Sequence, residues 1–278
     1  LDEGCQVTVL DLMIYGENVL SKHPQLKIIK GDIRDKALLE QALFGHDAVI
    51  HLACISNDPS FELNPVLGRS INLDAFRPLV EISRDSGVRR FVFASSSSVY
   101  GIKEERDVHE EMILEPLTDY SRFKADCECI LSDYEAPEFT TTTIRPATVC
   151  GYSPRMRLDV SVNLLTMHAL SRGKITVFGG KQIRPNIHID DIADLYIHLI
   201  NNPEYTGIYN AGFENLKIIE IAQKVAKIIP SKIVIKENND PRSYRQNSEK
   251  LLSTGFKQKF TIDDAIKELK NNYESKKF

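Results

Sequence analysis

Short apolar runs alternate with stretches of helical periodicity through the first two-thirds of the chain. The runs are rich in Val, Ile and Phe, which is typical of buried strands, and the stretches between them repeat apolar residues every three or four positions. Strands are expected at 6–10, 26–30, 47–53, 89–95 and 140–145, and helices at 36–43, 65–86 and 119–134. Short strands separated by helices predict a parallel, doubly wound sheet of the α/β class.

The alternation becomes less regular after Gly151, and a second, smaller α/β lobe that interleaves with the first is expected in this part of the chain. The helices expected after Gly151 span 158–171, 190–201, 220–229 and 261–271, and the strands span 174–178 and 232–236. Thr261 fits the N-cap of the last helix. Asp263 and Asp264 fit its first turn, because acidic side chains there interact favourably with the helix dipole.

Size and charge exclude several partner classes. The chain has 278 residues, of which 42% are hydrophobic, and a formal net charge of −4. It can therefore bury a large core, and it has no electrostatic reason to bind nucleic acid or a membrane surface. Its apolar runs are shorter than the roughly 20 residues that cross a bilayer. Neither a nucleic acid nor a membrane is expected as a partner.

The cysteines indicate a reducing compartment. There are five, Cys5, Cys54, Cys127, Cys129 and Cys150, and most lie in apolar strand or helix patterns. Their spacing is not that of a zinc site, so no metal is expected. No signal-peptide pattern precedes the first expected strand. We therefore expect reduced core thiols and a cytoplasmic location.

A tyrosine and a lysine, Tyr120 and Lys124, are candidates for proton transfer. Their spacing places them on one side of a helix, one turn apart. A free tyrosine has a pKa of about 10 and is a poor base at neutral pH. One positive charge at about 4 Å contributes roughly 4 kcal/mol at an effective dielectric of about 20, or about 3 pKa units. The pair can thus bring a phenol near neutrality, where proton transfer is most efficient.

The spacing alone is weak, and its context carries the prediction. With ten tyrosines and 35 basic residues among 278, about one such pair arises by chance. A second match, Tyr273 and Lys277, lies in a charged tail and is interpreted as an accident. The first match follows an expected strand that ends in the serine run 95–98. Open α/β sheets place their chemistry at such strand ends, although a solvated loop start explains the run equally well.

One expected motif is absent from the sequence. A dinucleotide-binding sheet opens with a strand, a glycine-rich turn and a helix, whereas residues 1–7 have the pattern of a helix end and a second strand. We expect a first strand and Gly-rich turn of about 20–25 residues before Leu1, because a sheet edge without them is a poor fold. Loss of the phosphate-binding turn is the alternative.

Taken together, the motifs resemble those of the extended short-chain dehydrogenase/reductases, in particular the NAD-dependent nucleotide-sugar epimerases and dehydratases of the UDP-galactose 4-epimerase type. The matching segments are 9–11, 31–35, 51–53, 95–101, 120–124, 145–151, 153–157 and 184–191. The resemblance implies a Rossmann-like fold, NAD as cofactor and a nucleotide-diphosphate sugar as substrate. It also implies a homodimer formed through helices 65–86 and 119–134.

The resemblance further implies how the chain is divided. The NAD-binding Rossmann domain would comprise 1–151 plus about 184–212. The interleaved substrate-binding lobe would comprise 152–183 plus 213–278.

Cofactor residues follow from the same resemblance. Asp11, at the end of the second strand of the family fold, would accept hydrogen bonds from the adenosine ribose, and its charge would favour NAD over NADP. Asp32 and Ile33 match the adenine-binding pair. The other cofactor positions that the resemblance implies are Leu52, Ala53, Asn72, Tyr120, Lys124, Pro146 and Val149.

For catalysis the resemblance implies Ser96, Tyr120 and Lys124. Tyr120 would take the proton of the sugar C4 hydroxyl while C4 gives a hydride to NAD, and Lys124 would also bind the nicotinamide ribose. The substrate positions that it implies are Ser96, Thr148, Asn163, Phe178, Arg184 and Arg242. Thr148 stands where an epimerase often has asparagine.

The reaction outcome is predicted from Ser97 and Ser98. Related 4,6-dehydratases have an Asp-Glu pair there, so the two serines favour a 4-epimerase. The alternatives are a 4-dehydrogenase, a 4-keto reductase or a dehydratase on the same scaffold, or a non-catalytic dinucleotide sensor. Arg155 and Arg157 either face substrate or solvate a loop, and His188 is expected to be structural.

Overall fold

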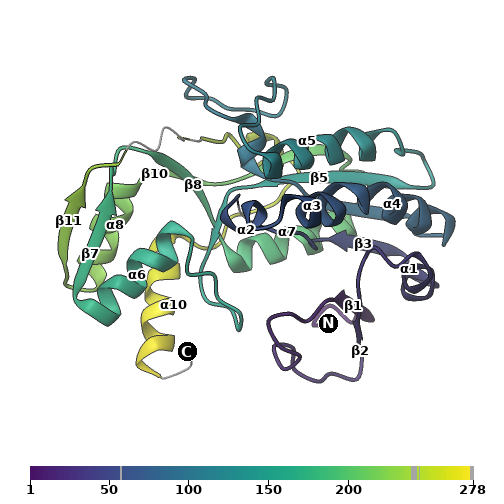
Figure 1. The fold of residues 1–278 in the computed structure, drawn as a ribbon, viewed down its shortest axis with the longest axis horizontal. Coiled ribbons are helices and arrows are strands. Elements are labelled where there is room, and N and C mark those ends of the chain that lie inside the picture. Colours follow the sequence, from purple (N-terminus) through teal and green to yellow (C-terminus); the bar gives the residue numbers. More distant parts are fainter. Residues whose placement is uncertain (57, 239–242, 244, 276–278) are drawn as a thin grey trace. The chain divides into compact units, whose positions relative to one another are not determined.

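The computed structural model describes residues 1–56, 58–238, 243 and 245–275 (Figure 1). The chain forms two compact units, Leu1–Ser95 with Leu117–Thr143, and Ser96–Pro116 with Ile144–Phe278. The functional division predicted from the sequence has other boundaries and stays a prediction.

The strands of the first unit pair in parallel. Strand β1 (Val7–Asp11) pairs with β2 (Leu26–Lys30), and β3 (Ala48–His51) pairs with β4 (Arg90–Ala94). The start of β5 (Thr140–Pro146) lies next to β4, where Thr140 N donates to Arg89 O at 2.9 Å. Within the described residues β1 and β3 belong to separate sheets. The predicted parallel pairing is confirmed, and the expectation of a preceding strand stays a prediction.

Helices α1 (Lys36–Leu43), α4 (Phe76–Asp85) and α5 (Asp119–Ser132) pack against β4. Their starts follow the expected capping rules. Asp35 accepts a hydrogen bond from Leu38 N at 3.1 Å, and Thr118 and Ser121 form a capping box on α5.

The helix predicted over 65–86 is present, but it contains a wider turn that was not predicted. The segment consists of α3 (Pro65–Arg69), a π-helical turn η1 (Ser70–Asp74) and α4, preceded by the short α2 (Asp58–Glu62). The wider turn contains Asn72, whose side chain bonds the loop after β3. Hydrophobic periodicity does not detect such a turn, because it changes the backbone ladder and leaves the apolar stripe in place.

An apolar core joins the helices of the first unit to β4. Phe76, Leu79, Phe91 and Phe93 are buried in it, together with Leu131 of α5. Because β4 and α5 share this core, the helix face that carries Tyr120 and Lys124 is held in a fixed position relative to the end of β4.

The second unit begins with the short 3-10 turn η2 (Ser97–Tyr100) and contains the end of β5, which lies next to β9 (Gly207–Ala211). Strand β8 (Ile183–His188) lies between β6 (Thr148–Cys150), which runs parallel to it, and β10 (Glu214–Lys217), which is antiparallel. Strands β7 (Lys174–Phe178) and β11 (Lys232–Lys236) form a parallel pair with the bounds predicted from the sequence.

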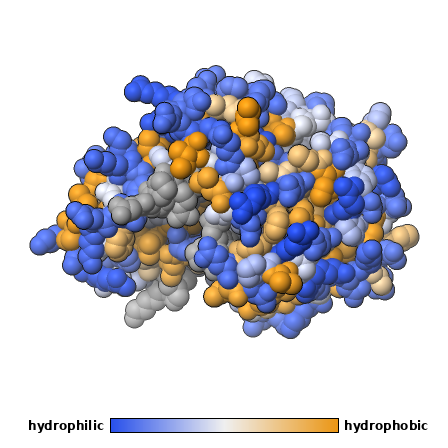
Figure 2. Space-filling model, turned by 45° about the horizontal axis from the view of Figure 1, so that its top comes forward, coloured by the Kyte–Doolittle hydropathy of each residue, from blue (hydrophilic) through white to orange (hydrophobic). Residues whose placement is uncertain are grey.

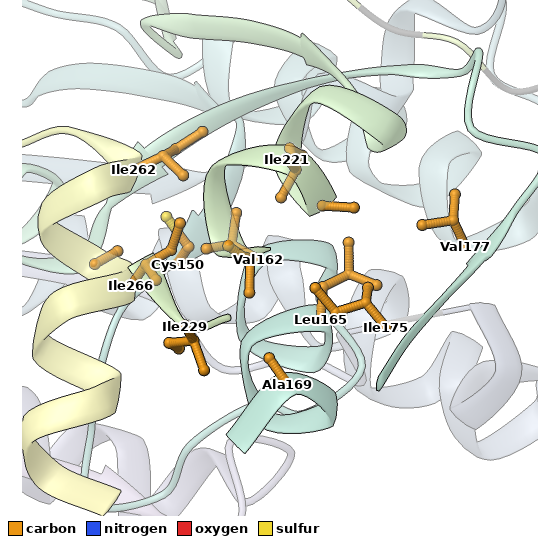
Figure 3. Packing of buried hydrophobic residues seen from close by; sticks show 13 residues of the cluster. Cys150, Val162, Leu165, Ala169, Ile175, Val177, Ile221, Ile229, Ile262 and Ile266 are labelled. Carbon is orange, nitrogen blue, oxygen red and sulfur yellow. The ribbon is translucent and has the colours of Figure 1, made fainter. Parts of the chain in front are cut away.

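Three helices of this unit, α6 (Ser161–Arg172), α8 (Ile218–Ile228) and α10 (Ile262–Glu274), enclose its core. Figure 3 shows Val162, Ile221 and Ile266 from these helices pointing toward one another beside Cys150. Thr261 caps α10 and Asp263 and Asp264 occupy its first turn, as predicted. The remaining helices are α7 (Ile189–Asn201) and α9 (Glu249–Leu252).

Hydrophilic residues dominate the face seen in Figure 2, and hydrophobic residues are scattered among them. Such scattered apolar residues are normal for a protein surface. Among the described helices, none has the length and apolar character needed to cross a bilayer.

Candidate active site

Tyr120, Lys124 and Glu128 follow one another at four-residue intervals along α5 and therefore share one face of the helix. Lys124 is buried, and its Nζ donates to Ala94 O, at the end of β4, at 2.6 Å. The same Nζ lies 4.8 Å from the ring centroid of Phe93 and 5.9 Å from that of Tyr120. The structure thus places a fixed ammonium beside the candidate base, and a nearby cation favours the ionised form of a phenol.

Two titratable neighbours of Lys124 are held neutral. Burial, assisted by the positive charge of Lys124, lowers the pKa of His51 to about 3. Burial raises the pKa of the Cys127 thiol to about 12, and this thiol donates to Asn72 O at 3.2 Å. Lys124 therefore has a neutral imidazole and a neutral thiol as neighbours.

The serine run begins where β4 ends. The hydroxyl of Ser95 donates to Glu128 Oε1, and both side chains are buried. In the second unit, Ser96 is the N-cap of η2, with its Oγ 2.9 Å from Ser98 Oγ and accepting from Ser98 N at 3.2 Å. The Ser96 hydroxyl is thus oriented by the turn that follows it.

A buried polar network supports this turn inside the second unit. Tyr100 OH donates to Asn210 Oδ1 at 2.7 Å and accepts from Arg145 at 2.8 Å. Glu110 Oε1 accepts from Asn210 N at 2.7 Å. Burial raises the pKa of Tyr100 to about 12, so this tyrosine is a neutral hydrogen-bonding group.

Sequence reasoning missed Glu128, Glu110 and Asn210. Glu128 could have been found, because it lies one turn beyond Lys124 on the same helix face. Nothing in the sequence connects Glu110 with Asn210, since the two are 100 positions apart.

Three of the cofactor positions implied by the resemblance, Asp11, Asp32 and Ile33, are exposed or half-buried in the first unit. Asp11 is exposed at the end of β1, and its Oδ1 accepts from Met13 N at 2.6 Å. Asp32 is paired with Arg34 at 2.5 Å, and this guanidinium holds the pKa of the Asp32 carboxyl below its ordinary value. Ile33 lines a cavity of about 220 Å³.

The loop after β3 carries Leu52 and Ala53, which are exposed and half-buried. Asn72 is buried behind this loop. Its amide accepts from Ile55 N at 2.8 Å and donates to Ile55 O at 3.0 Å. The Asn72 side chain makes the same pair of hydrogen bonds that the backbone of a neighbouring strand would make. It therefore holds the loop in place although no strand pairs with it.

The remaining implied positions lie in the second unit. Pro146, Thr148 and Val149 are half-buried at the end of β5 and on β6. Phe178 is 53% exposed at the end of β7, and Arg184 on β8 donates to Ile183 O at 3.0 Å. Asn163 is buried and bonds backbone groups of the loop before α6. Arg242 lies outside the described residues.

The expected cofactor residues of the first unit fit a dinucleotide. Asp11 offers an exposed carboxylate to ribose hydroxyls, and Lys124, with three N–H donors, can bind a further acceptor besides Ala94 O. A tyrosine with a lysine one helical turn away, beside the end of a parallel strand, is the arrangement that the sequence resemblance assigns to NAD-dependent enzymes.

Comparison with known proteins identifies the family. A model of the NAD dependent epimerase/dehydratase family matches residues 1–212. The chain belongs to this family. Membership confirms the predicted enzyme class and NAD as the cofactor.

Curated relatives carry both activities of the family. A UDP-glucose 4-epimerase from Lactobacillus helveticus is 29% identical, and the match covers 95% of this chain and 88% of that protein. A dTDP-D-glucose 4,6-dehydratase from Dictyostelium discoideum is 27% identical, with 81% and 56% covered.

Solved structures confirm the fold. The UDP-glucose 4-epimerase of Thermus thermophilus in complex with NAD has a TM-score of 0.85 at 23% identity, covering 97% of this chain and 92% of that chain. A dTDP-glucose 4,6-dehydratase from Streptomyces venezuelae has a TM-score of 0.86 at 22% identity, covering 98% and 88%. The predicted Rossmann-like α/β class is therefore correct.

Proposed function

We propose that the protein is an NAD-dependent nucleotide-sugar 4-epimerase. The observation that carries this proposal is that serines stand at positions 97 and 98. Ser97 is buried, and Ser98 Oγ is 2.9 Å from Ser96 Oγ. A 4,6-dehydratase uses a carboxylic acid and a carboxylate at these positions to eliminate water. A serine hydroxyl is neither a carboxylic acid nor a carboxylate at neutral pH, so Ser97 and Ser98 cannot replace that pair, and the proposed reaction ends with re-reduction at C4.

In the proposed reaction the chain supplies proton transfer and orientation. NAD, when bound, supplies the hydride acceptor and later returns the hydride. Tyr120 takes the proton of the C4 hydroxyl and gives it back after the sugar has turned, and Ser96 holds the C4 oxygen. Lys124 stabilises the ionised Tyr120 by Coulomb attraction. Carbon C4 passes through a ketone, and reduction from the other side of the sugar ring inverts it.

The proposed substrate is a nucleotide-diphosphate sugar. Arg184 and Arg242 are proposed to bind the diphosphate, because guanidinium groups bind phosphate oxygens in a bidentate manner. Thr148, Asn163 and Phe178 are proposed to line the rest of the substrate pocket. The similar 4-epimerase and 4,6-dehydratase relatives, which act on UDP-glucose and dTDP-glucose by name, support this substrate class.

A homodimer and a cytoplasmic location are further parts of the proposal. The proposed interface contains residues 65–86 and 119–134. Val66 is 80% exposed and the neighbouring Leu63 is 86% exposed, which leaves apolar surface on this side of the first unit. Sedimentation should give twice the monomer mass, and Val66→Asp should give a monomer. A monomeric wild-type protein would contradict the dimer.

One assay separates the proposed activity from its alternatives. The protein is incubated with NAD and with UDP-, GDP- and dTDP-hexoses, and sugar products are separated by chromatography. Inversion at C4 is expected for one nucleotide sugar, and Tyr120→Phe should abolish it. A 4-keto-6-deoxy product would instead indicate a dehydratase, and stoichiometric NADH a 4-dehydrogenase. Binding of NAD without any sugar conversion would favour a sensor.

A further inference from the structure

The loop between β6 and α6 is anchored at both ends in the core of the second unit. Cys150 precedes it and Val162 follows it, and both pack beside Ile262 and Ile266 of α10 (Figure 3). The loop leaves the carboxyl end of β6, where sheets of this type place ligands. Its flanking residues Thr148 and Asn163 are both proposed substrate positions.

Asn163 holds the two ends of this loop together. Its Oδ1 accepts from Gly151 N at 3.0 Å, and its Nδ2 donates to Gly151 O at 3.1 Å and to Arg157 O at 3.0 Å. An asparagine amide has two N–H donors and one carbonyl oxygen, so all three groups act on the loop backbone. The amide of Asn163 is thus engaged by backbone groups of the loop.

A second brace comes from α10. Glu268 Oε2 accepts from Tyr152 N at 3.1 Å and lies 3.5 Å from His188 Nε2. Gly151 lies next to both side chains and has a φ of +119°. A Cβ on this residue would lie 3.3 Å from Glu268 Oε2, 3.3 Å from His188 Nε2 and 2.9 Å from Ile189 Cγ2. Only glycine lets the loop backbone approach the carboxylate this closely.

His188 fixes the direction of that carboxylate. It is buried, its ring centroid lies 4.8 Å from that of Phe260, and its Nδ1 accepts from Asp190 N at 3.1 Å. With Nδ1 as acceptor, a neutral imidazole carries its proton on Nε2, which faces Glu268. Asp191 holds Phe260 in turn by accepting from its backbone N at 3.1 Å.

We propose that Glu268, oriented by His188, is a positioning residue that fixes loop 151–157 as the wall of the nucleotide-sugar site, so that α10 sets the affinity for substrate. The loop contributes Arg155 and Arg157, whose positive charge suits a diphosphate. Arg157 is already aligned by Asp159, with nitrogen–oxygen distances of 3.0 and 2.6 Å. The claim that the loop sets the affinity for substrate (the substrate part) rests on the proposed function. The claim that Glu268 fixes the loop (the loop part) does not.

The loop part is tested by native-state proteolysis of the full chain. Trypsin needs an extended segment for cleavage after Arg155 and Arg157, so the cleavage rate at these bonds should rise with the population in which the loop has left its braced conformation. Glu268→Gln should raise cleavage at these two bonds about tenfold, which corresponds to about 1.4 kcal/mol. Glu274→Gln makes the same change on the same helix away from the loop, where Glu274 faces Lys270 at 3.9 Å, and should leave cleavage unchanged.

The substrate part is tested by kinetics on the same variants. Glu268→Gln should raise the KM for the nucleotide sugar about tenfold and leave kcat within about twofold, since the loss is in binding. Glu268→Asp, which keeps the charge, should restore part of both properties and covers the case in which the glutamine variant does not fold.

Three outcomes overturn the inference: unchanged cleavage, increased cleavage with an unchanged KM, and a fall in kcat alone. If the wild-type chain inverts no sugar, the proposed function fails. The affinities of the wild-type and Glu268→Gln proteins for UDP-glucose, measured by calorimetry, then replace KM. This comparison tests the role of Glu268 separately from the proposed function.

Discussion

Ser95 and Glu128 are hydrogen-bonded to each other in the buried space between the end of β4 and α5. One turn earlier on the helix, Lys124 donates to Ala94 O, the residue before Ser95. Two consecutive residues of the strand end are therefore attached to two consecutive turns of the helix. The position of the candidate base Tyr120 relative to the end of β4 depends on these two attachments.

Removing the Ser95 hydroxyl should destabilise the protein. Ser95→Ala leaves a buried carboxylate without one of its donors, which costs about 1–3 kcal/mol. The free energy of unfolding should fall by that amount in urea titrations, and kcat should fall with it. Ser132→Ala on the exposed end of α5 is the control and should change stability little. Equal stability of Ser95→Ala and wild type would show that the bond between Ser95 and Glu128 is unimportant.

Tyr120→Phe should lower kcat by about 10²–10⁴-fold, the usual contribution of a general acid–base. The ring stays in place, so the circular dichroism spectrum and the thermal midpoint should be unchanged. Tyr273→Phe is a matched control, because Tyr273 is the other tyrosine with a lysine four positions later. Its variant should be fully active. Comparable losses in the two variants would contradict the assignment of Tyr120.

The stability of the protein should decrease as pH falls below about 6.5, because of His51. Its pKa is about 3 in the folded protein against an ordinary value of 6.5, so the unfolded chain binds a proton that the folded protein excludes. The free energy of unfolding should fall by about 1.4 kcal/mol per pH unit from this group, or about 2 kcal/mol between pH 6.5 and 5. His51→Gln should lose this part of the slope, whereas His23→Gln, at an exposed position, should keep it. Identical slopes in both variants would contradict the prediction.

The sequence was sufficient for the parts of the fold that depend on local pattern. Strands 174–178 and 232–236 are confirmed at the predicted bounds, and Thr261 begins its helix as predicted. Strand β10 was not predicted as a strand, because it contains Glu, Asn and Lys. Whether polar residues form a strand depends on the side chains and strands next to them in the sheet, and the sequence does not show these neighbours.

The candidate site also contains residues that the sequence predicts and contacts that it does not. The spacing of Tyr120 and Lys124 could be interpreted because a helix fixes what lies four residues away. The contacts of Glu268 with Tyr152 and of Glu110 with Asn210 join segments 116 and 100 positions apart. Such contacts are set by the tertiary fold, so no local pattern predicts them.

Asp11→Ala should weaken NAD binding and reduce discrimination against NADP. The Asp11 carboxylate is exposed at the end of β1, where it can accept ribose hydroxyls and repel a 2′-phosphate. Loss of hydrogen bonds to a charged acceptor should raise the Kd of NAD by about tenfold or more, measured by calorimetry. The Kd of NADP should fall relative to that of NAD. Asp2→Ala, an exposed control near the chain start, should change neither value.

Tyr100→Phe tests whether the buried network of the second unit supports the turn that carries Ser96. The phenol oxygen accepts from Arg145 at 2.8 Å and donates to Asn210 at 2.7 Å, so its removal leaves two buried groups each short of a partner. The free energy of unfolding should fall by about 1–3 kcal/mol. Tyr205→Phe, outside this network, is the control. Because the η2 turn loses an attachment at Tyr100, kcat should fall while the KM for NAD stays constant. A Tyr100→Phe protein with wild-type stability and kcat would show that the turn is held by its own backbone alone.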